Sequence, residues 1–146
     1  MKARPFIVTP DDTAPISVLG VSITVLAANT ATEGYEITLQ EGDEGAGPPS
    51  HSHDWDESFY VLRGEVEVNC EGSLSKLGAG SLVHVPRGTV HAYRFGRGGG
   101  RMLEVSSQGG GATRMFTNVG MEFPRPDGDV PRLLRLLLEN GVRIAS

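Results

Sequence analysis

The sequence has one cysteine, no run of 18 apolar residues, and no apolar stretch near its amino terminus of the kind that a signal peptide needs. A lone cysteine cannot form an internal disulfide, which is typical of a reducing compartment. The missing apolar runs exclude a membrane-spanning helix and a secretion signal. These absences predict a soluble, cytoplasmic protein.

The charge of the chain also excludes some partners. Thirteen basic residues against 18 acidic ones give a net charge of −5, and no basic block occurs. Nucleic acid and anionic membranes are therefore poor partners, and a small-molecule ligand fits better. The length of 146 residues predicts one domain over residues 1–146, large enough to fold without disulfides or a structural metal. Any bound metal would then be free for chemistry.

Glycine and proline are frequent, with 20 and nine residues, and they separate short runs of alternating or β-branched residues. This pattern predicts an all-β sandwich or barrel over about residues 16–107. Cys70 lies in one alternating run and is expected to be buried and unreactive. Turns are expected at Arg63-Gly64 and at Gly96–Gly100, among others. The expected strands cover residues 16–27, 35–41, 50–53, 58–62, 65–71, 73–76, 81–85, 91–95 and 102–106.

The region after Gly109 predicts one short helix over about residues 130–140. Asp129 is expected to cap its start and Asn140-Gly141 to end it. The helix is amphipathic, so we expect it to pack on the barrel. Its apolar face is expected to consist of Leu133, Leu134, Leu137 and Leu138.

Three histidines and one glutamate have the spacing of metal ligands. His51 and His53 are two residues apart, so on a strand they point to the same face and can bind one ion. Glu57 would lie about 20 Å from His51 on a straight strand, so the chain must turn before Glu57. The turn at Pro86–Gly88 can deliver His91 from another direction. The sequence therefore predicts one mononuclear metal site.

Five further residues lie close to this cluster in the sequence. Trp55 is either a gate at the mouth of the site or an exposed hydrophobic residue in a loop. Arg87 either orients a substrate or is a solvated turn residue. We expect His84 to be packed or at an interface, and Asp54 and Asp56 to solvate the turn rather than to support the metal ligands.

Two motifs resemble those of the cupin superfamily. The first consists of Gly45, five residues, His51-Ser52-His53, three residues, Glu57, six residues and Gly64. The second consists of Gly80, five residues, Pro86-Arg87-Gly88, two residues and His91. Fifteen residues, Glu65 to Ala79, separate the two motifs, which is similar to the spacing in compact microbial cupins. The tail is more loosely similar to small cupins grouped with quercetin dioxygenases.

The resemblance implies a jelly-roll β-barrel, a homodimer, and metal ligation by His51, His53, Glu57 and His91. One position departs from the second motif, because Phe95 stands where the family often has asparagine. Tyr93 and Phe95 follow His91 by two and four residues, so on a strand they point to the same face as His91, which predicts an apolar pocket. The expected lining is Phe59, Val61, Tyr93, Phe95, Tyr35 and Ile37.

Four protein ligands fill a tetrahedral zinc site, whereas they leave two positions open on octahedral iron, manganese, nickel or cobalt. We expect one divalent Fe, Mn, Ni, Co or Zn ion, and the sequence does not distinguish among them. Open positions for an enolate and for dioxygen favour a dioxygenase that acts on a small enolisable or aromatic hydroxylated compound. Glu57 can serve as ligand and as proton acceptor. Tyr93 is either a catalytic residue that orients the substrate or a core residue.

Two other functions fit the same residues. A binding or sensing module would use the metal only to hold a small ligand. A non-oxidative isomerase, cyclase or lyase would use the metal as a Lewis acid. The cupin fold carries many chemistries, so the resemblance does not choose among them.

Overall fold

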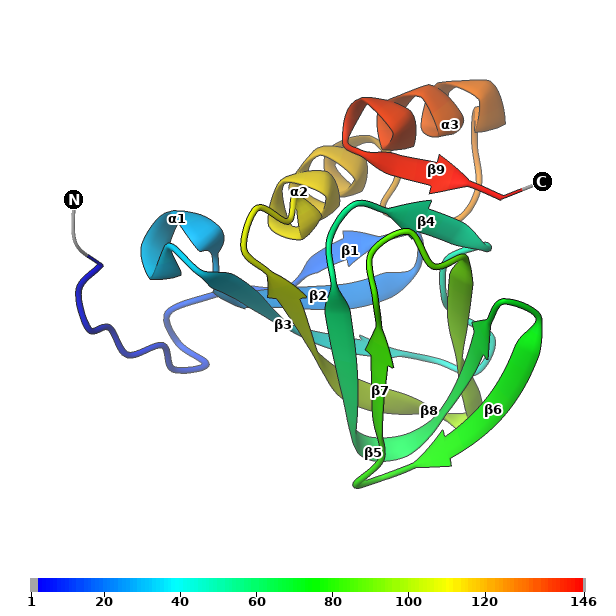
Figure 1. Cartoon of the computed structure of the whole chain (residues 1–146), viewed down its shortest axis with the longest axis horizontal. Coiled ribbons are helices and arrows are strands. Elements are labelled where there is room, and N and C mark those ends of the chain that lie inside the picture. The colour runs from blue at the N-terminus through cyan, green and yellow to red at the C-terminus, as the bar shows by residue number, and fades with distance from the viewer. Residues whose placement is uncertain (1–2, 146) are drawn as a thin grey trace.

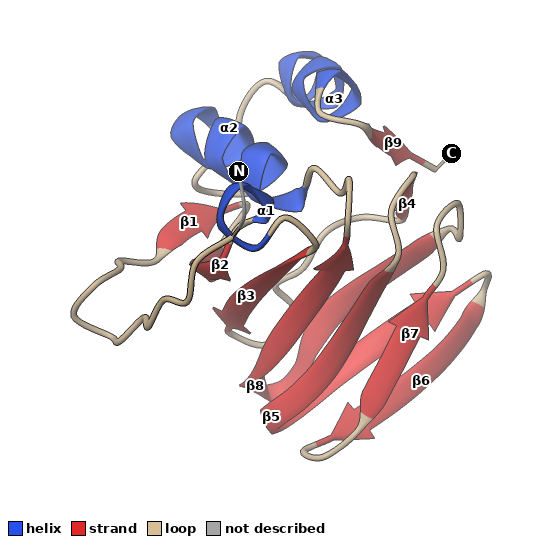
Figure 2. Cartoon of the chain, turned by 60° about the vertical axis from the view of Figure 1, so that its left-hand side comes forward, coloured by secondary structure: helices blue, strands red, loops and turns tan. Residues whose placement is uncertain are grey.

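The computed structural model of the chain describes residues 3–145, which form nine strands and three helices. The strands form one strongly curled antiparallel sheet, which makes the wall of an open barrel (Figure 1, Figure 2). Phe59, Val61, Val66, Phe95 and Met102 fill its interior and are at most 2% exposed. The predicted all-β barrel is confirmed.

The sheet brings together strands that are far apart in the sequence. Along one path the strand order is β1-β2-β3-β8-β4-β9, and β5 pairs with β6, β7 and β8. The strands are β1 (Ile16–Val18), β2 (Val21–Ala27), β3 (Tyr35–Gly42), β4 (His51–His53), β5 (Glu57–Cys70), β6 (Ser73–Gly78), β7 (Leu82–Val85), β8 (His91–Ser107) and β9 (Val142–Ile144). The helices are α1 (Asn29–Thr32), α2 (Ala112–Glu122) and α3 (Val130–Glu139).

Two predicted turns are bends inside long strands. β5 and β8 are continuous where we expected breaks at Arg63-Gly64 and at Gly96–Gly100. The β5–β8 register shifts on both sides of Gly64. The φ of Gly64 is +73°, and a Cβ atom there would overlap the carbonyl oxygen of Gly99, so this crossing requires glycine. Glycine here bends a strand rather than ending it.

The predicted strand over residues 16–27 is a hairpin of β1 and β2. Val18 pairs with Val21. Leu19 and Gly20 between them have φ values of 51° and 83°, as in a two-residue type I′ turn. Leucine is uncommon at positive φ, so the residue types did not indicate this turn.

The carboxy-terminal region contains more than the single helix predicted. α3 has the expected bounds, and the side chain of Asp129 accepts a hydrogen bond from the backbone of its first turn. The prediction of its apolar face was wrong in part, because Leu136 and Leu137 are buried while Leu134 and Leu138 are exposed. α1, α2 and β9 were not predicted.

α2, α3 and β9 lie together over one end of the barrel (Figure 1, Figure 2), and we call this group the cap. β9 pairs with β4, with Ile144 opposite His51 and Val142 opposite His53. The cap is therefore hydrogen-bonded to the strand that carries the first two histidines. None of the helices in residues 3–145 is long and apolar enough to cross a membrane.

Candidate metal centre

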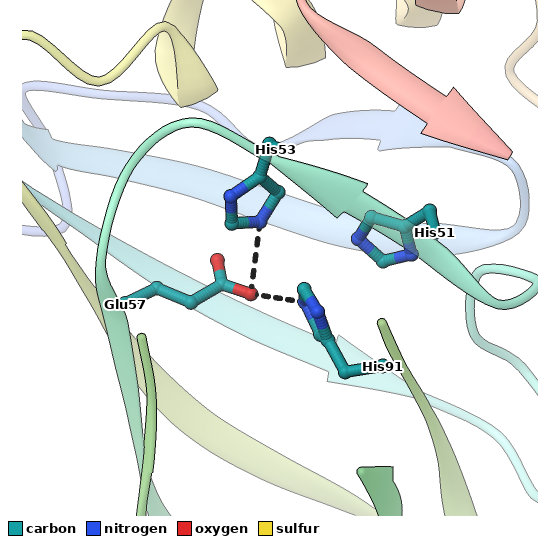
Figure 3. Close-up of side chains that lie close together, drawn as sticks. All are labelled: His51, His53, Glu57 and His91. Carbon is teal, nitrogen blue, oxygen red and sulfur yellow. Dashed lines mark hydrogen bonds and ion pairs between the residues drawn. The ribbon is translucent and has the colours of Figure 1, made fainter. Parts of the chain in front are cut away.

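β4 and the start of β5 bring the first three residues of the cluster together. His51 and His53 point to the same side of β4, as expected for residues two apart. The chain turns over residues 54–56, and Glu57, the first residue of β5, faces back toward the two rings (Figure 3). All three side chains are buried, with exposures of 8%, 5% and 5%.

His91 arrives from the turn between β7 and β8. Gly88 has a φ of +81°, and its N–H donates to the carbonyl oxygen of His53 at 2.9 Å. Asp56 holds this turn, because its carboxylate accepts hydrogen bonds from the backbone N–H and the guanidinium of Arg87. Both side chains lie in exposed turns, so Arg87 serves the turn and does not reach the cluster. His91 itself is 1% exposed.

The four side chains converge on one point. One ligand atom from each of His51, His53, Glu57 and His91 lies within 4.8 Å of the others. Glu57 Oε1 is 2.5 Å from His91 Nε2 and 3.2 Å from His53 Nε2 (Figure 3). Neighbouring ligands on an octahedral ion, each about 2.1 Å from it, lie about 3.0 Å apart. The spacing is compatible with a single divalent metal.

Hydrogen bonds to the backbone fix the orientation of all three rings. Nδ1 of His51, His53 and His91 lies 2.8 to 3.0 Å from the carbonyl oxygens of Pro49, Trp55 and Thr89, respectively. A carbonyl oxygen only accepts, so each Nδ1 carries a proton and donates it. Nε2 is then the nitrogen that each ring turns inward. This is the arrangement that metal-binding histidines use.

The electrostatics of the cluster favour a bound cation. Burial lowers the pKa of His51 to about 4, and the neighbouring His91 contributes. Burial alone would raise the pKa of Glu57, but hydrogen bonds from His53 and His91 outweigh it and lower that pKa to about 2. Burial opposes the charge of His91, yet its contact with Glu57 raises its pKa. At neutral pH the cluster therefore offers a carboxylate and a neutral His51 imidazole.

A small cavity of about 60 Å³ lies beside the cluster, between the barrel and the cap. The expected lining was wrong for Tyr35 and Ile37, because Tyr35 is 47% exposed and Ile37 points the same way. Val61 and Phe95 belong to the core rather than to the lining. The lining comprises Val18, Leu19, Val21, Ile23, Pro48, Pro49, His51, His53, Trp55, Glu57, Phe59, Tyr93, Glu104, Ala112, Met115, Phe116, Leu137, Val142 and Ile144.

Polar residues that the sequence analysis missed lie on the inner face of β3 and β8. Thr38, Gln40, Glu104 and Ser106 are at most 3% exposed. Gln40 Nε2 donates to Glu104 Oε2 at 2.6 Å, and the hydroxyl of Tyr93 donates to Gln40 Oε1 at 2.5 Å. Burial, followed by the charge of Glu57, raises the pKa of Glu104 well above its usual range. The parity of the predicted strand over residues 102–106 could have indicated that Glu104 faces inward.

Three other residues differ from their expected surroundings. Trp55 is 5% exposed and stacks on His53, with ring centroids 4.1 Å apart and planes 4° apart, so it is not an exposed loop residue. His84 is exposed, and its Nδ1 pairs with the hydroxyl of Ser58, so it is not packed. Cys70 is only partly buried, and burial raises the pKa of its thiol, which favours the unreactive protonated form.

Residues 35–105, which include the whole cluster, match the family described as a cupin domain. This region is a cupin domain. A quercetin 2,3-dioxygenase of Bacillus subtilis is 36% identical over 73 residues, which are 49% of this chain and 22% of that protein. The chain spans less than a quarter of the length of the curated relatives it matches.

Solved cupin structures share the fold over most of the chain. An RmlC-like cupin from Shewanella frigidimarina is 23% identical, with a TM-score of 0.65, and the match covers 74% of this chain and 95% of that one. The polyketide cyclase RemF of Streptomyces resistomycificus is 21% identical, with a TM-score of 0.62, and the match covers 71% and 80% of the two chains. At these identities the likeness shows the cupin fold alone.

Proposed function

We propose that His51, His53, Glu57 and His91 bind one divalent transition-metal ion, and that the protein is a metal-dependent dioxygenase acting on a small enolisable or hydroxylated compound. The observation that carries this proposal is the buried cluster of three inward Nε2 atoms and one carboxylate at the wall of a mostly apolar cavity. The similarity to a quercetin 2,3-dioxygenase over half of the chain supports the oxidative reaction.

A divalent metal held here would supply a Lewis acid with coordination positions left for substrate and dioxygen. Glu57 would add a proton acceptor. Its Oε1 faces His53 and His91, whereas Oε2 has no hydrogen-bond partner among residues 3–145, and the side chain lines the cavity. Oε2 can therefore take a proton from an enolisable substrate. Tyr93 would act indirectly, since its hydroxyl donates to Gln40.

The size of the cavity favours a small substrate. Its volume of about 60 Å³ is below the roughly 150 Å³ of a cavity that holds benzene. An open-chain diketone or hydroxyketone therefore fits better than a flavonol. The apolar residues of the cap, such as Met115, Phe116 and Val142, would exclude water from such a ligand.

Oxygen consumption tests this function. Protein loaded separately with iron, manganese, nickel, cobalt or zinc should consume oxygen with a member of a panel that contains small β-diketones, hydroxyketones and flavonols. We expect the diketones to be the better substrates. An absence of oxygen uptake with every metal and every compound would contradict the dioxygenase.

A second candidate is a non-oxidative lyase, isomerase or cyclase, because a Lewis-acid metal held by the same four side chains would also support reactions that do not use oxygen. Turnover of the same panel in the absence of oxygen would identify it. Saturable binding without turnover in either atmosphere would instead identify the binding or sensing module. In each case the metal cluster is the same and the reaction differs.

We also propose that two copies of the chain pair through the outer face of the sheet. Apolar side chains form a continuous strip there, because Ile37 lies opposite Val105 and Tyr60 lies next to both Leu103 and Leu82. Tyr60, Leu82 and Val105 are 42%, 63% and 39% exposed, and such strips favour association. Light scattering should give a dimer for the wild type and a monomer for a Tyr60→Lys, Leu82→Lys double variant. A monomeric wild type would contradict the pairing.

The cytoplasmic location of the protein stays a prediction.

A further inference from the structure

Glu104 is a buried carboxyl group that the proposed metal cluster does not use. It lies on β8, is 3% exposed and lines the cavity. On the β5–β8 ladder, Ser106 is opposite Glu57 and Glu104 is opposite Phe59. Glu57 and Glu104 are thus diagonal neighbours on the inner face, a relation in which residues lie about 7–8 Å apart and their Cβ atoms somewhat closer. The two carboxyl groups border the same space.

The side chain of Glu104 is held in a fixed position. Gln40 Nε2 donates to Oε2 at 2.6 Å, and Ser106 Oγ donates to Oε1 at 3.1 Å. Gln40 is fixed in turn by the hydroxyl of Tyr93. Each carboxyl oxygen can take part in two hydrogen bonds. One position on each oxygen therefore remains for a ligand.

Glu104 is not buried as half of a structural ion pair. No Lys, Arg or His among residues 3–145 forms a salt bridge with it. Burying an ionisable group without an opposite charge costs free energy, and such groups concentrate at functional sites. Ligand binding by Glu104 would explain why a carboxyl group is buried here without an opposite charge.

We infer that Glu104 is a second ligand-binding residue, which hydrogen-bonds the hydroxyl or carbonyl oxygen of a compound whose other oxygen lies at the metal cluster. This inference rests on the proposed function. A neutral Glu104 donates to a carbonyl oxygen, and an ionised one accepts from a hydroxyl group. The substrate class is thus a small, mostly apolar compound with two oxygen functions at one end and its apolar remainder against the cap.

The test uses two probes that differ by one hydroxyl group, glycolate and acetate. Each is titrated into cobalt(II)-loaded protein, and the visible cobalt spectrum reports binding without turnover. The quantity compared is the ratio of the two dissociation constants, in which the shared carboxylate charge cancels. The wild type should prefer glycolate, and Glu104→Met should lower that preference about tenfold, the effect of one lost hydrogen bond.

Two variants serve as controls. Glu104→Gln should keep the preference within about threefold, because an amide also donates and accepts. Glu36→Gln changes another glutamate of the inner face, which is also 3% exposed, accepts a hydrogen bond from the backbone N–H of Thr113 and does not line the cavity. It should leave the preference unchanged. Should Glu104→Met fail to fold, Ser106→Ala decides, and a fall of about threefold is expected.

Three results would overturn the inference about Glu104: a preference unchanged in Glu104→Met and Ser106→Ala, an equal loss in Glu36→Gln, or a cobalt-loaded wild type that does not prefer glycolate. If the wild type takes up no cobalt at the cluster, the proposed function itself fails, and the inference about Glu104 fails with it.

Discussion

β3 and β5 line the same barrel with opposite kinds of side chain. After Glu57, the inward residues of β5 include Phe59, Val61, Val66 and Val68, which are at most 3% exposed. β3 turns Glu36, Thr38 and Gln40 inward and leaves Tyr35, Ile37 and Leu39 on the outer face. β5 therefore supplies core, whereas β3 supplies a polar wall next to the metal cluster. The inward side chains of β3 are thus buried and polar, and its apolar side chains lie on the outer face of the sheet.

The largest expected effect is the loss of metal when one histidine of the metal cluster is substituted. His91→Ala removes one of the four proposed ligands and should lower the metal content of the purified protein to near zero, and His51→Ala should do the same. Elemental analysis measures the content, and circular dichroism should show an intact barrel, because the apolar strands supply the core. His84→Ala is the matched control, since His84 lies on the outer face. Full metal content in either ligand variant would refute the assignment.

The second prediction concerns the apolar region. Phe95→Ala should lower the free energy of unfolding by about 3–5 kcal/mol, because Phe95 is 1% exposed and lies opposite Val66 of β5, so its loss leaves a void in the core. Ser106→Ala, on the polar wall, should cost only about 1 kcal/mol. Chemical denaturation of the metal-free protein measures both. An equal loss of unfolding free energy in the two variants would contradict the difference between the apolar core and the buried polar residues.

The third prediction is that metal uptake releases a proton from His91. The pKa of His91 is raised above its ordinary value of 6.5, so at pH 6.5 more than half of the molecules carry the proton that the metal must displace. His51, with a pKa of about 4, and Glu57, with a pKa of about 2, release none. The release should therefore fall as the pH rises through the raised pKa of His91.

Calorimetry of metal binding in buffers with different ionisation enthalpies measures this release. At pH 6.5 we expect at least half a proton per metal from His91. Metal affinity should correspondingly weaken toward acid pH, because protons compete for the imidazoles. A release that increases with pH would show that His91 is not protonated in the metal-free protein.

The smallest effect is expected at Arg87, which lies outside both regions. Its side chain is 63% exposed, and its ion pair with Asp56 is at the surface. Arg87→Ala should change the thermal midpoint little and leave metal content and substrate KM unchanged. Asp56→Asn should behave alike. A raised KM in Arg87→Ala alone would instead indicate that Arg87 orients the substrate.

Short-range pattern was enough to predict the cluster residues as neighbours. Two histidines on one strand, a turn before Glu57 and a turn before His91 are each local features. Long-range pairing was not predictable in the same way. β9 is three residues long, and only its pairing with β4 makes it a strand.

The missed polar wall has a different cause. Apolar residues of a strand are usually the inward ones, so Tyr35 and Ile37 were expected in the pocket, and Gln40 and Glu104 were not. Parity alone does not say which face of a strand is inside when the inner face is polar. A similar ambiguity affected α3, where Leu134 and Leu136 both belong to an apolar stretch and packing against β9 and α2 buries Leu136.

Anomalous X-ray diffraction from a crystal of the cobalt-loaded protein would test the metal cluster most directly. The account predicts one strong peak per chain, about 2.0–2.2 Å from Nε2 of each of the three rings and from the Glu57 carboxylate. A peak bound by other side chains, or none within the barrel, would contradict it.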